Sequence, residues 1–131
     1  MKTVKVTNAT RGRTIGARVG VADTWWKRLR GLIGRPPLES DEGLLLRPCR
    51  AVHMWGMTYP IDVAFLDSGN EVVALYRELA PGARTRWHGR AKCALELPGG
   101  KLAESGTEVG DVVEWAPAGN GNGTGAQEAV R

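Results

Sequence analysis

Cysteine, histidine and phenylalanine are scarce in this chain of 131 residues, which contains two cysteines, two histidines and one phenylalanine. Cys49 and Cys93 are too few and too far apart in the sequence to build the disulfide framework of a small secreted domain. We expect both to be reduced, semi-buried thiols. With only two histidines, the chain also has few side chains that could serve as a general base near neutral pH.

A long apolar segment is also absent. No stretch of the sequence approaches the roughly 20 apolar residues that span a membrane. The first residues, MKTVKVTNATRGR, are basic, but the apolar core of a secretory signal does not follow them. We therefore expect a cytoplasmic protein without a membrane span.

The composition changes near the end of the chain. Residues 117–131, PAGNGNGTGAQEAVR, contain glycine, asparagine and small apolar side chains that cannot bury enough surface to offset the entropy of ordering them. We predict a single β-rich domain over residues 1–116, followed by a flexible tail over residues 117–131.

Period-two alternation of apolar and polar residues predicts most of the secondary structure. Short segments with this pattern, or with short apolar runs, are separated by turns rich in Gly, Pro, Asn and Asp. They cover residues 2–7, 15–21, 44–46, 51–55, 61–66, 71–76, 92–97 and 107–115. Seven or eight short strands predict a mainly β fold, either a sandwich or a squat, jelly-roll-like barrel.

One segment has helical periodicity. In TWWKRLRGLIG, offsets of three and four place Trp25, Leu29, Leu32 and Ile33 on one face, with Asp23 or Thr24 as the N-cap. Gly34 and the two prolines that follow should end this helix. We expect one short amphipathic helix packed against the sheet.

Five motifs in order resemble the family called domain of unknown function 192. They are Arg30-Gly31-Leu32, the run at residues 43–46, PIDVAFLD at 60–67, LELPGG at 95–100 and GDVV at 110–113. The resemblance spans residues 10–115 and implies a compact, mainly β fold with one helix, but no activity. The matched positions Pro60, Asp62, Glu96, Gly100 and Asp111 are carried over as architecture rather than as catalysts.

The chain departs from that family at one place. Many members have Phe-Trp-Met-Lys-Asn-Thr before a Pro-Leu-Asp motif, whereas this chain has VHMWGM at residues 52–57. If the Lys-Asn-Thr run forms a shared polar site, this chain lacks it.

Polar side chains within apolar strands indicate a candidate ligand site. Such groups must be paired or must face a cavity. Burying an unpaired carboxylate costs roughly several kcal/mol of folding free energy, unless the carboxylate becomes protonated. We predict that His53, Asp62 and Glu96 approach one another with Trp55 or Trp87 at the rim. A purely structural role for Asp62, at the turn beside Pro60, is the competing interpretation.

Three other functions stay open, and a basic surface is the first. The segment RTRWHGRAK, residues 84–92, surrounds Trp87 with cations and could contact nucleic acid, although a solvated basic face explains it more simply. The net charge of +4 would attract an anionic partner.

A metal site and a catalytic site are the other two. Cys49, His53, His88 and Cys93 contain the ligand types of a zinc site, but their spacing is wider than usual, so we predict no metal or other cofactor. Acid–base chemistry by Asp62, Glu96 and His53 is conceivable, and we assign no catalytic residue. The leading interpretation is a non-catalytic binding domain for a polar or sugar-like small ligand, with nucleic acid a less favoured partner.

Overall fold

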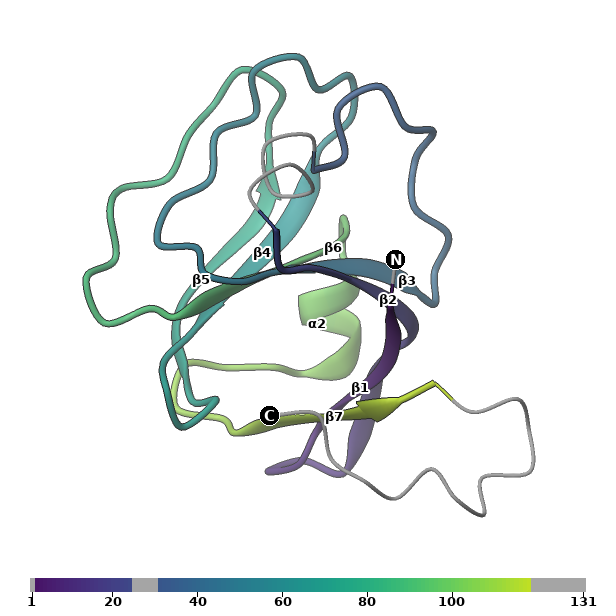
Figure 1. The fold of residues 1–131 in the computed structure, drawn as a ribbon, viewed down its shortest axis with the longest axis vertical. Coiled ribbons are helices and arrows are strands. Elements are labelled where there is room, and N and C mark those ends of the chain that lie inside the picture. Colours follow the sequence, from purple (N-terminus) through teal and green to yellow (C-terminus); the bar gives the residue numbers. More distant parts are fainter. Residues whose placement is uncertain (1, 25–30, 119–131) are drawn as a thin grey trace.

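The computed structural model describes residues 2–24 and 31–118, in which seven strands form one strongly curled sheet (Figure 1). Along the sheet the strand order is β5-β4-β6-β3-β2-β1-β7. The strands are β1 (Thr3–Asn8), β2 (Arg13–Ala22), β3 (Glu42–Leu46), β4 (Ile61–Leu66), β5 (Val72–Leu79), β6 (Cys93–Pro98) and β7 (Val113–Pro117).

The curl brings the two edges of the sheet together at one end. All neighbouring strands are antiparallel except β2 and β3. Val72 N donates to Asp111 O (2.8 Å) and Val113 N donates to Asn70 O (2.9 Å), which joins the start of β5 to the start of β7. The predicted mainly β class is confirmed, and the architecture is a half-barrel.

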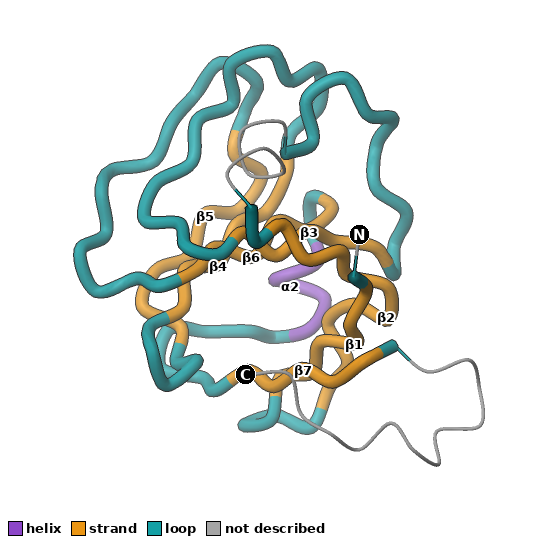
Figure 2. The backbone as a smooth tube through the Cα atoms, viewed as in Figure 1, coloured by secondary structure: helices purple, strands orange, loops and turns teal. Residues whose placement is uncertain are grey.

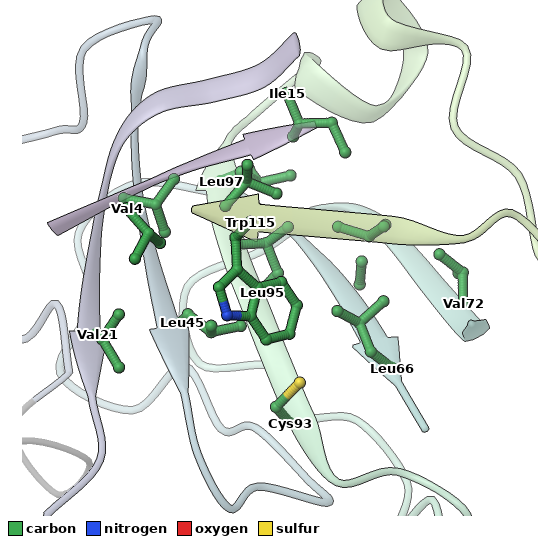
Figure 3. Packing of buried hydrophobic residues seen from close by; sticks show 14 of the residues in the cluster. Val4, Ile15, Val21, Leu45, Leu66, Val72, Cys93, Leu95, Leu97 and Trp115 are labelled. Atoms are coloured by element: carbon green, nitrogen blue, oxygen red, sulfur yellow. The ribbon is translucent and has the colours of Figure 1, made fainter. Parts of the chain in front are cut away.

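The concave side of the sheet holds the larger apolar core (Figure 3). Strand alternation sends every second side chain of β4 and β6 into it, including Leu66, Cys93 and Leu95. Trp115 of β7 reaches the same interior. Burial raises the pKa of the Cys93 thiol to about 12, so this cysteine is an inert core residue.

A second core lies on the convex side of the central strands. Leu44, Leu46, Val63 and Phe65 belong to this core. Long loops run along this side of the sheet (Figure 2). Residues 47–60 and 80–92 form two of these loops and contribute apolar side chains such as Met54. Both faces of β4 and β6 are therefore buried, although loops rather than a second sheet cover the outer one.

The described residues contain one short helix, α2 (Lys101–Ser105), on the concave side (Figure 1). This helix was not predicted, because its five residues are too few for a periodic pattern. The predicted helix over 25–33 lies mainly outside the described residues, and residues 31–34 form turns. No helix in the described part of the chain has the length and apolarity needed to cross a lipid bilayer.

One predicted strand is absent from the sheet, and another begins later than predicted. Residues 51–55 pair with the other long loop and make only an isolated bridge at His53, so they are not part of the sheet. The predicted strand over 107–115 begins only at Val113, because residues 107–112 turn around Asp111. At the other end, β7 continues to Pro117, and Ala118 N donates to Thr3 O (3.1 Å). The predicted tail beyond residue 118 lies outside the described residues.

Asp111 organises the closed end of the half-barrel. Its carboxylate accepts from Arg11 Nε (2.6 Å), Asn8 Nδ2 (2.9 Å) and Glu108 N (3.0 Å). The hydrogen bond from Arg11 is the main reason that the pKa of Asp111 falls to about 2. Because these partners come from β1, the β1–β2 turn and the turn before β7, the carboxylate ties the two ends of the described chain together.

Removing this charge should destabilise the protein. Asp111→Asn should lower the free energy of unfolding at pH 7 by about 1–3 kcal/mol, because buried donors lose their acceptor. The pKa of Asp111 is lower in the folded state, so its contribution is present above about pH 4 and is lost as the pH falls towards 2.

Urea denaturation at pH 7, 4 and 2.5 measures the effect, with Asp41→Asn as the control. Asp41 also pairs with an arginine, Arg18, but its side chain is 43% exposed, so its loss should matter much less. Equal effects of the two variants would contradict the role given to Asp111.

Candidate functional site

A cavity of ≈ 540 Å³ lies against the convex face of the sheet, under the loops. It is lined by Gly31, Leu32, Ile33, Leu46, Pro48, Cys49, Arg50, Ala51, Val52, His53, Met54, Met57, Trp87 and Glu96. The lining is mainly apolar, and the volume falls within the range of small-molecule sites in proteins.

Hydrogen bonds between the two long loops hold one wall of this cavity in place. Residues 50–54 pair with residues 82–88, and we call this pair the loop ribbon. Met54 N donates to Ala83 O (2.7 Å), and Thr85 N donates to Val52 O (2.9 Å). Val52 N donates in turn to Thr85 Oγ1 (3.0 Å). The wall is therefore built by main-chain pairing rather than by side-chain contacts alone.

The loop ribbon is attached to the sheet through His88. Its Nε2 lies 2.7 Å from the hydroxyl of Tyr76 on β5, and its ring lies 4.6 Å from the ring of Phe65. Burial and, to a lesser extent, the nearby Arg86 lower the pKa of His88, which favours the neutral ring. These contacts position the segment that carries Trp87.

Glu96 is the buried carboxylate in the cavity wall. It lies on β6, where its register partners are Leu44 and Val63, and the residue is only 6% exposed. Its Oε1 is buried and has no hydrogen-bond partner among the described residues. Burial raises the pKa of Glu96 to about 7. Buried polar atoms are normally paired, so this oxygen is an unused acceptor on a residue that lines an apolar cavity.

The other polar groups around the cavity differ in exposure. Arg50 Nε is buried and also has no partner in the described part of the chain. His53 is exposed, and Trp87 is 69% exposed, which places both at the rim. The cavity thus combines an apolar lining with one acceptor and one donor that the described residues leave unused.

Comparison with known proteins identifies the family. The family model of DUF192, described as Uncharacterized ACR, COG1430, matches residues 4–115. The chain belongs to the DUF192 family. It is 38% identical over 112 residues to a UPF0127 protein of Thermococcus sibiricus, covering 82% of this chain and 72% of that protein.

Two crystal structures share the fold of this DUF192 chain. A protein of unknown function from Novosphingobium aromaticivorans superposes with a TM-score of 0.73 at 28% identity, covering 86% of this chain and 84% of the other. A candidate transcription regulator from Sinorhizobium meliloti gives a TM-score of 0.70 at 26% identity, covering 87% of this chain and 92% of the other. The predicted family membership is thus confirmed.

The structure brings three of the five predicted ligand-site residues to one cavity. His53, Trp87 and Glu96 line it, whereas Asp62 and Trp55 do not. Asp62 is opposite Leu97 in the β4–β6 register and therefore faces the concave side, away from Glu96. Trp55 lies just beyond the loop ribbon and is 76% exposed.

Asp62 has a structural role of its own. Its Oδ1 accepts from Glu78 N (2.8 Å) and Gly100 N (3.1 Å), and its Oδ2 accepts from Leu102 N (2.8 Å). Gly100 has φ +91°, a left-handed conformation that favours glycine. The fully buried carboxylate thus joins β5 to the start of α2, a structural role with partners other than the turn beside Pro60.

The two cysteines and the two histidines do not gather at one place. Cys93 packs in the concave core, while Cys49 and His53 line the cavity on the convex side. His88 contacts Tyr76. Within residues 2–24 and 31–118, no three His, Cys, Asp or Glu side chains gather closely enough to hold a metal ion.

Sequence reasoning missed Arg50 and the two methionines, Met54 and Met57, as lining residues. The segment that departs from the usual family pattern, residues 52–57, supplies much of this wall. The unusual composition of this segment was the available sequence signal. In the structure, Val52 and Met54 are buried and alternate with the exposed His53.

Replacing the carboxylate of Asp62 should destabilise the fold. Asp62→Asn turns one acceptor oxygen into a donor that faces main-chain N–H groups. The free energy of unfolding, measured by urea denaturation, should fall by about 1–3 kcal/mol. Asp23→Asn, a change at an exposed position, should have almost no effect. An unchanged stability of Asp62→Asn would show that these three hydrogen bonds contribute little.

Glu96 should make the stability depend on pH. Because its folded-state pKa is raised from 4.5 to about 7, the unfolded chain releases this proton first. The free energy of unfolding should therefore fall as the pH rises from 4.5 to 7. The Glu96→Gln variant lacks this titrating group. The difference in unfolding free energy between wild type and variant, measured by urea denaturation, should therefore change between pH 4.5 and 7. A constant difference would mean that Glu96 titrates normally.

Proposed function

We propose that this DUF192 protein binds a small molecule with an apolar body and at least one hydrogen-bond donor, in the cytoplasm. The observation that carries this proposal is that Glu96, which lines the apolar cavity, has a buried Oε1 without a partner among the described residues. An unmade hydrogen bond at a buried group costs about 1–3 kcal/mol, which a ligand donor would recover.

The surroundings of Glu96 support a ligand of this kind. The apolar lining, with Leu46, Val52 and Met54, suits a hydrocarbon or ring surface. The indole of Trp87 at the rim suits the face of a sugar or an aromatic ring. Arg50 Nε offers a donor for an acceptor group on the same ligand. Neutral alcohols, amides and sugar-like molecules combine these features.

A second candidate function is acid–base catalysis at the same cavity. It is favoured by the pKa of Glu96, about 7, which is where a general acid or base is most effective near neutral pH. His53 lines the same cavity and could exchange the second proton. Binding alone leaves the bound molecule unchanged, whereas catalysis converts it, so recovery of the ligand after incubation separates the two candidates.

A fragment screen by NMR tests the binding proposal. Uniformly ¹⁵N-labelled protein is titrated with small alcohols, amides, sugars and matched hydrocarbons that lack a donor. Hits should shift the Trp87 indole signal and the amides of Leu46 and Met54. Donor-bearing hits should lose about tenfold in affinity in Glu96→Gln, because a carboxylate accepts more strongly than an amide.

Glu114→Gln, on the exposed side of β7, is the matched control and should leave every affinity unchanged. The proposal fails if no fragment shifts these signals. It also fails if donor-bearing and donor-free fragments respond identically to Glu96→Gln.

A further inference from the structure

The two long loops form a surface with charge of one sign. Residues 47–60 and 80–92, which we call the basic loop surface, contain six arginines and lysines but no aspartate or glutamate. These six residues are Arg47, Arg50, Arg84, Arg86, Arg90 and Lys92. The whole chain has 18 basic and 14 acidic residues, so all of its acidic residues lie outside these two segments.

Most of the cations on this surface carry no bound counter-charge. Arg84, Arg86 and Lys92 are exposed and form no ion pair with any described residue. Arg90 lies 3.7 Å from Asp67, but its side chain is 75% exposed. Unpaired cations held on a defined main-chain scaffold can neutralise an anionic partner without first breaking internal ion pairs.

Two exposed indoles lie among these cations. Trp55 is 76% and Trp87 is 69% exposed, the highest values among the large apolar residues described. Trp55 follows Met54, which pairs with Ala83, and Trp87 precedes His88, whose amide donates to Arg50 O (2.8 Å). The two indoles therefore lie at opposite ends of the loop ribbon. Between them, His53 and Arg84 form a bridge with exposed side chains.

We infer that the basic loop surface binds single-stranded nucleic acid, with Trp55 and Trp87 as stacking platforms and Arg84, Arg86 and Lys92 at the phosphates. Single strands expose unpaired bases that stack on aromatic side chains while cations follow the backbone. The inference shares Trp87 with the small-molecule proposal, whereas Trp55 and the three cations do not line the cavity and can be tested separately.

Charge and exposure favour this partner over a lipid surface. Membrane-bound segments place several large apolar side chains together for insertion into the bilayer. In the described residues, the other exposed large apolar side chains are Val109 and Val112, which lie in the turn before β7 and not in the loops. Two separate indoles surrounded by cations provide stacking faces but no continuous apolar area.

Fluorescence polarisation with a fluorescein-labelled 20-nucleotide oligo(dT) strand, and with the oligo(rU) counterpart, tests the inference. We expect saturable binding at 50 mM salt. The logarithm of the binding constant should fall linearly with the logarithm of the salt concentration. Trp55→Ala should weaken binding roughly 5- to 150-fold, the range for loss of one stacked base, and Trp55→Tyr should restore most of it. The double change Arg84→Ser and Arg86→Ser should weaken binding and reduce the salt slope by about 1.4.

The matched control removes two cations from another part of the molecule. The double change Lys2→Ser and Lys5→Ser removes the same number of charges at two exposed positions of the N-terminal segment. Because salt screens distant charges, it should change the affinity by no more than about twofold. Trp55→Ala should leave any fragment binding at the cavity unchanged, so failure of this inference can be told from failure of the small-molecule proposal. Thermal unfolding confirms that each variant is folded.

Four outcomes would overturn the inference. One is no binding to either strand at 50 mM salt. Another is a loss of affinity in the Lys2 and Lys5 control equal to that in the Arg84 and Arg86 double variant, which would mean attraction by net charge alone. A third is tighter binding to a duplex of the same length. The last is binding to phosphatidylserine-containing vesicles that depends on Trp55 while oligonucleotide binding does not.

Discussion

The antiparallel pairing of β4 with β6 is the constraint on which the rest of the structure depends. Six residue pairs, from Ile61–Pro98 to Leu66–Cys93, join these strands, and their side chains are buried on both faces. Because neighbouring residues of a strand point to opposite faces, this register determines which polar side chain enters which core. Asp62 faces the concave core and Glu96 faces the convex one, although the two residues lie on adjacent strands.

The two carboxylates consequently have opposite roles. Asp62 finds three main-chain N–H donors, because β5 and α2 present them on the concave side. Glu96 meets loops that pair with each other instead, so its Oε1 has no partner among the described residues. A satisfied carboxylate holds the fold, and the unsatisfied one is the basis of the ligand proposal.

The loop ribbon links the two proposals in one physical feature. Its inward side chains, such as Val52 and Met54, complete the second core and the cavity. Its outward side chains, His53 and Arg84, face solvent together with the indole of Trp55. One extended segment can serve both purposes because alternate side chains point in opposite directions. Apart from Arg50 and Trp87, which belong to both, the residues of the cavity and of the basic loop surface can therefore be altered by separate substitutions.

Local sequence patterns determined the strands of the sheet and the mainly β class, because period-two alternation reflects burial on one or both faces of a strand. They also identified His53, Trp87 and Glu96 as residues of interest, since polar or aromatic groups beside apolar strands need a partner or a cavity. Only the tertiary structure decided that Asp62 and Glu96 are separated, because strand register depends on pairing between distant segments. Likewise, residues 51–55 alternate as a strand does, yet they pair with a loop. The basic segment 84–92 comes to lie beside residues 47–60, which contain no aspartate or glutamate, only when the chain folds. Long-range pairing decides these points, and no local pattern contains it.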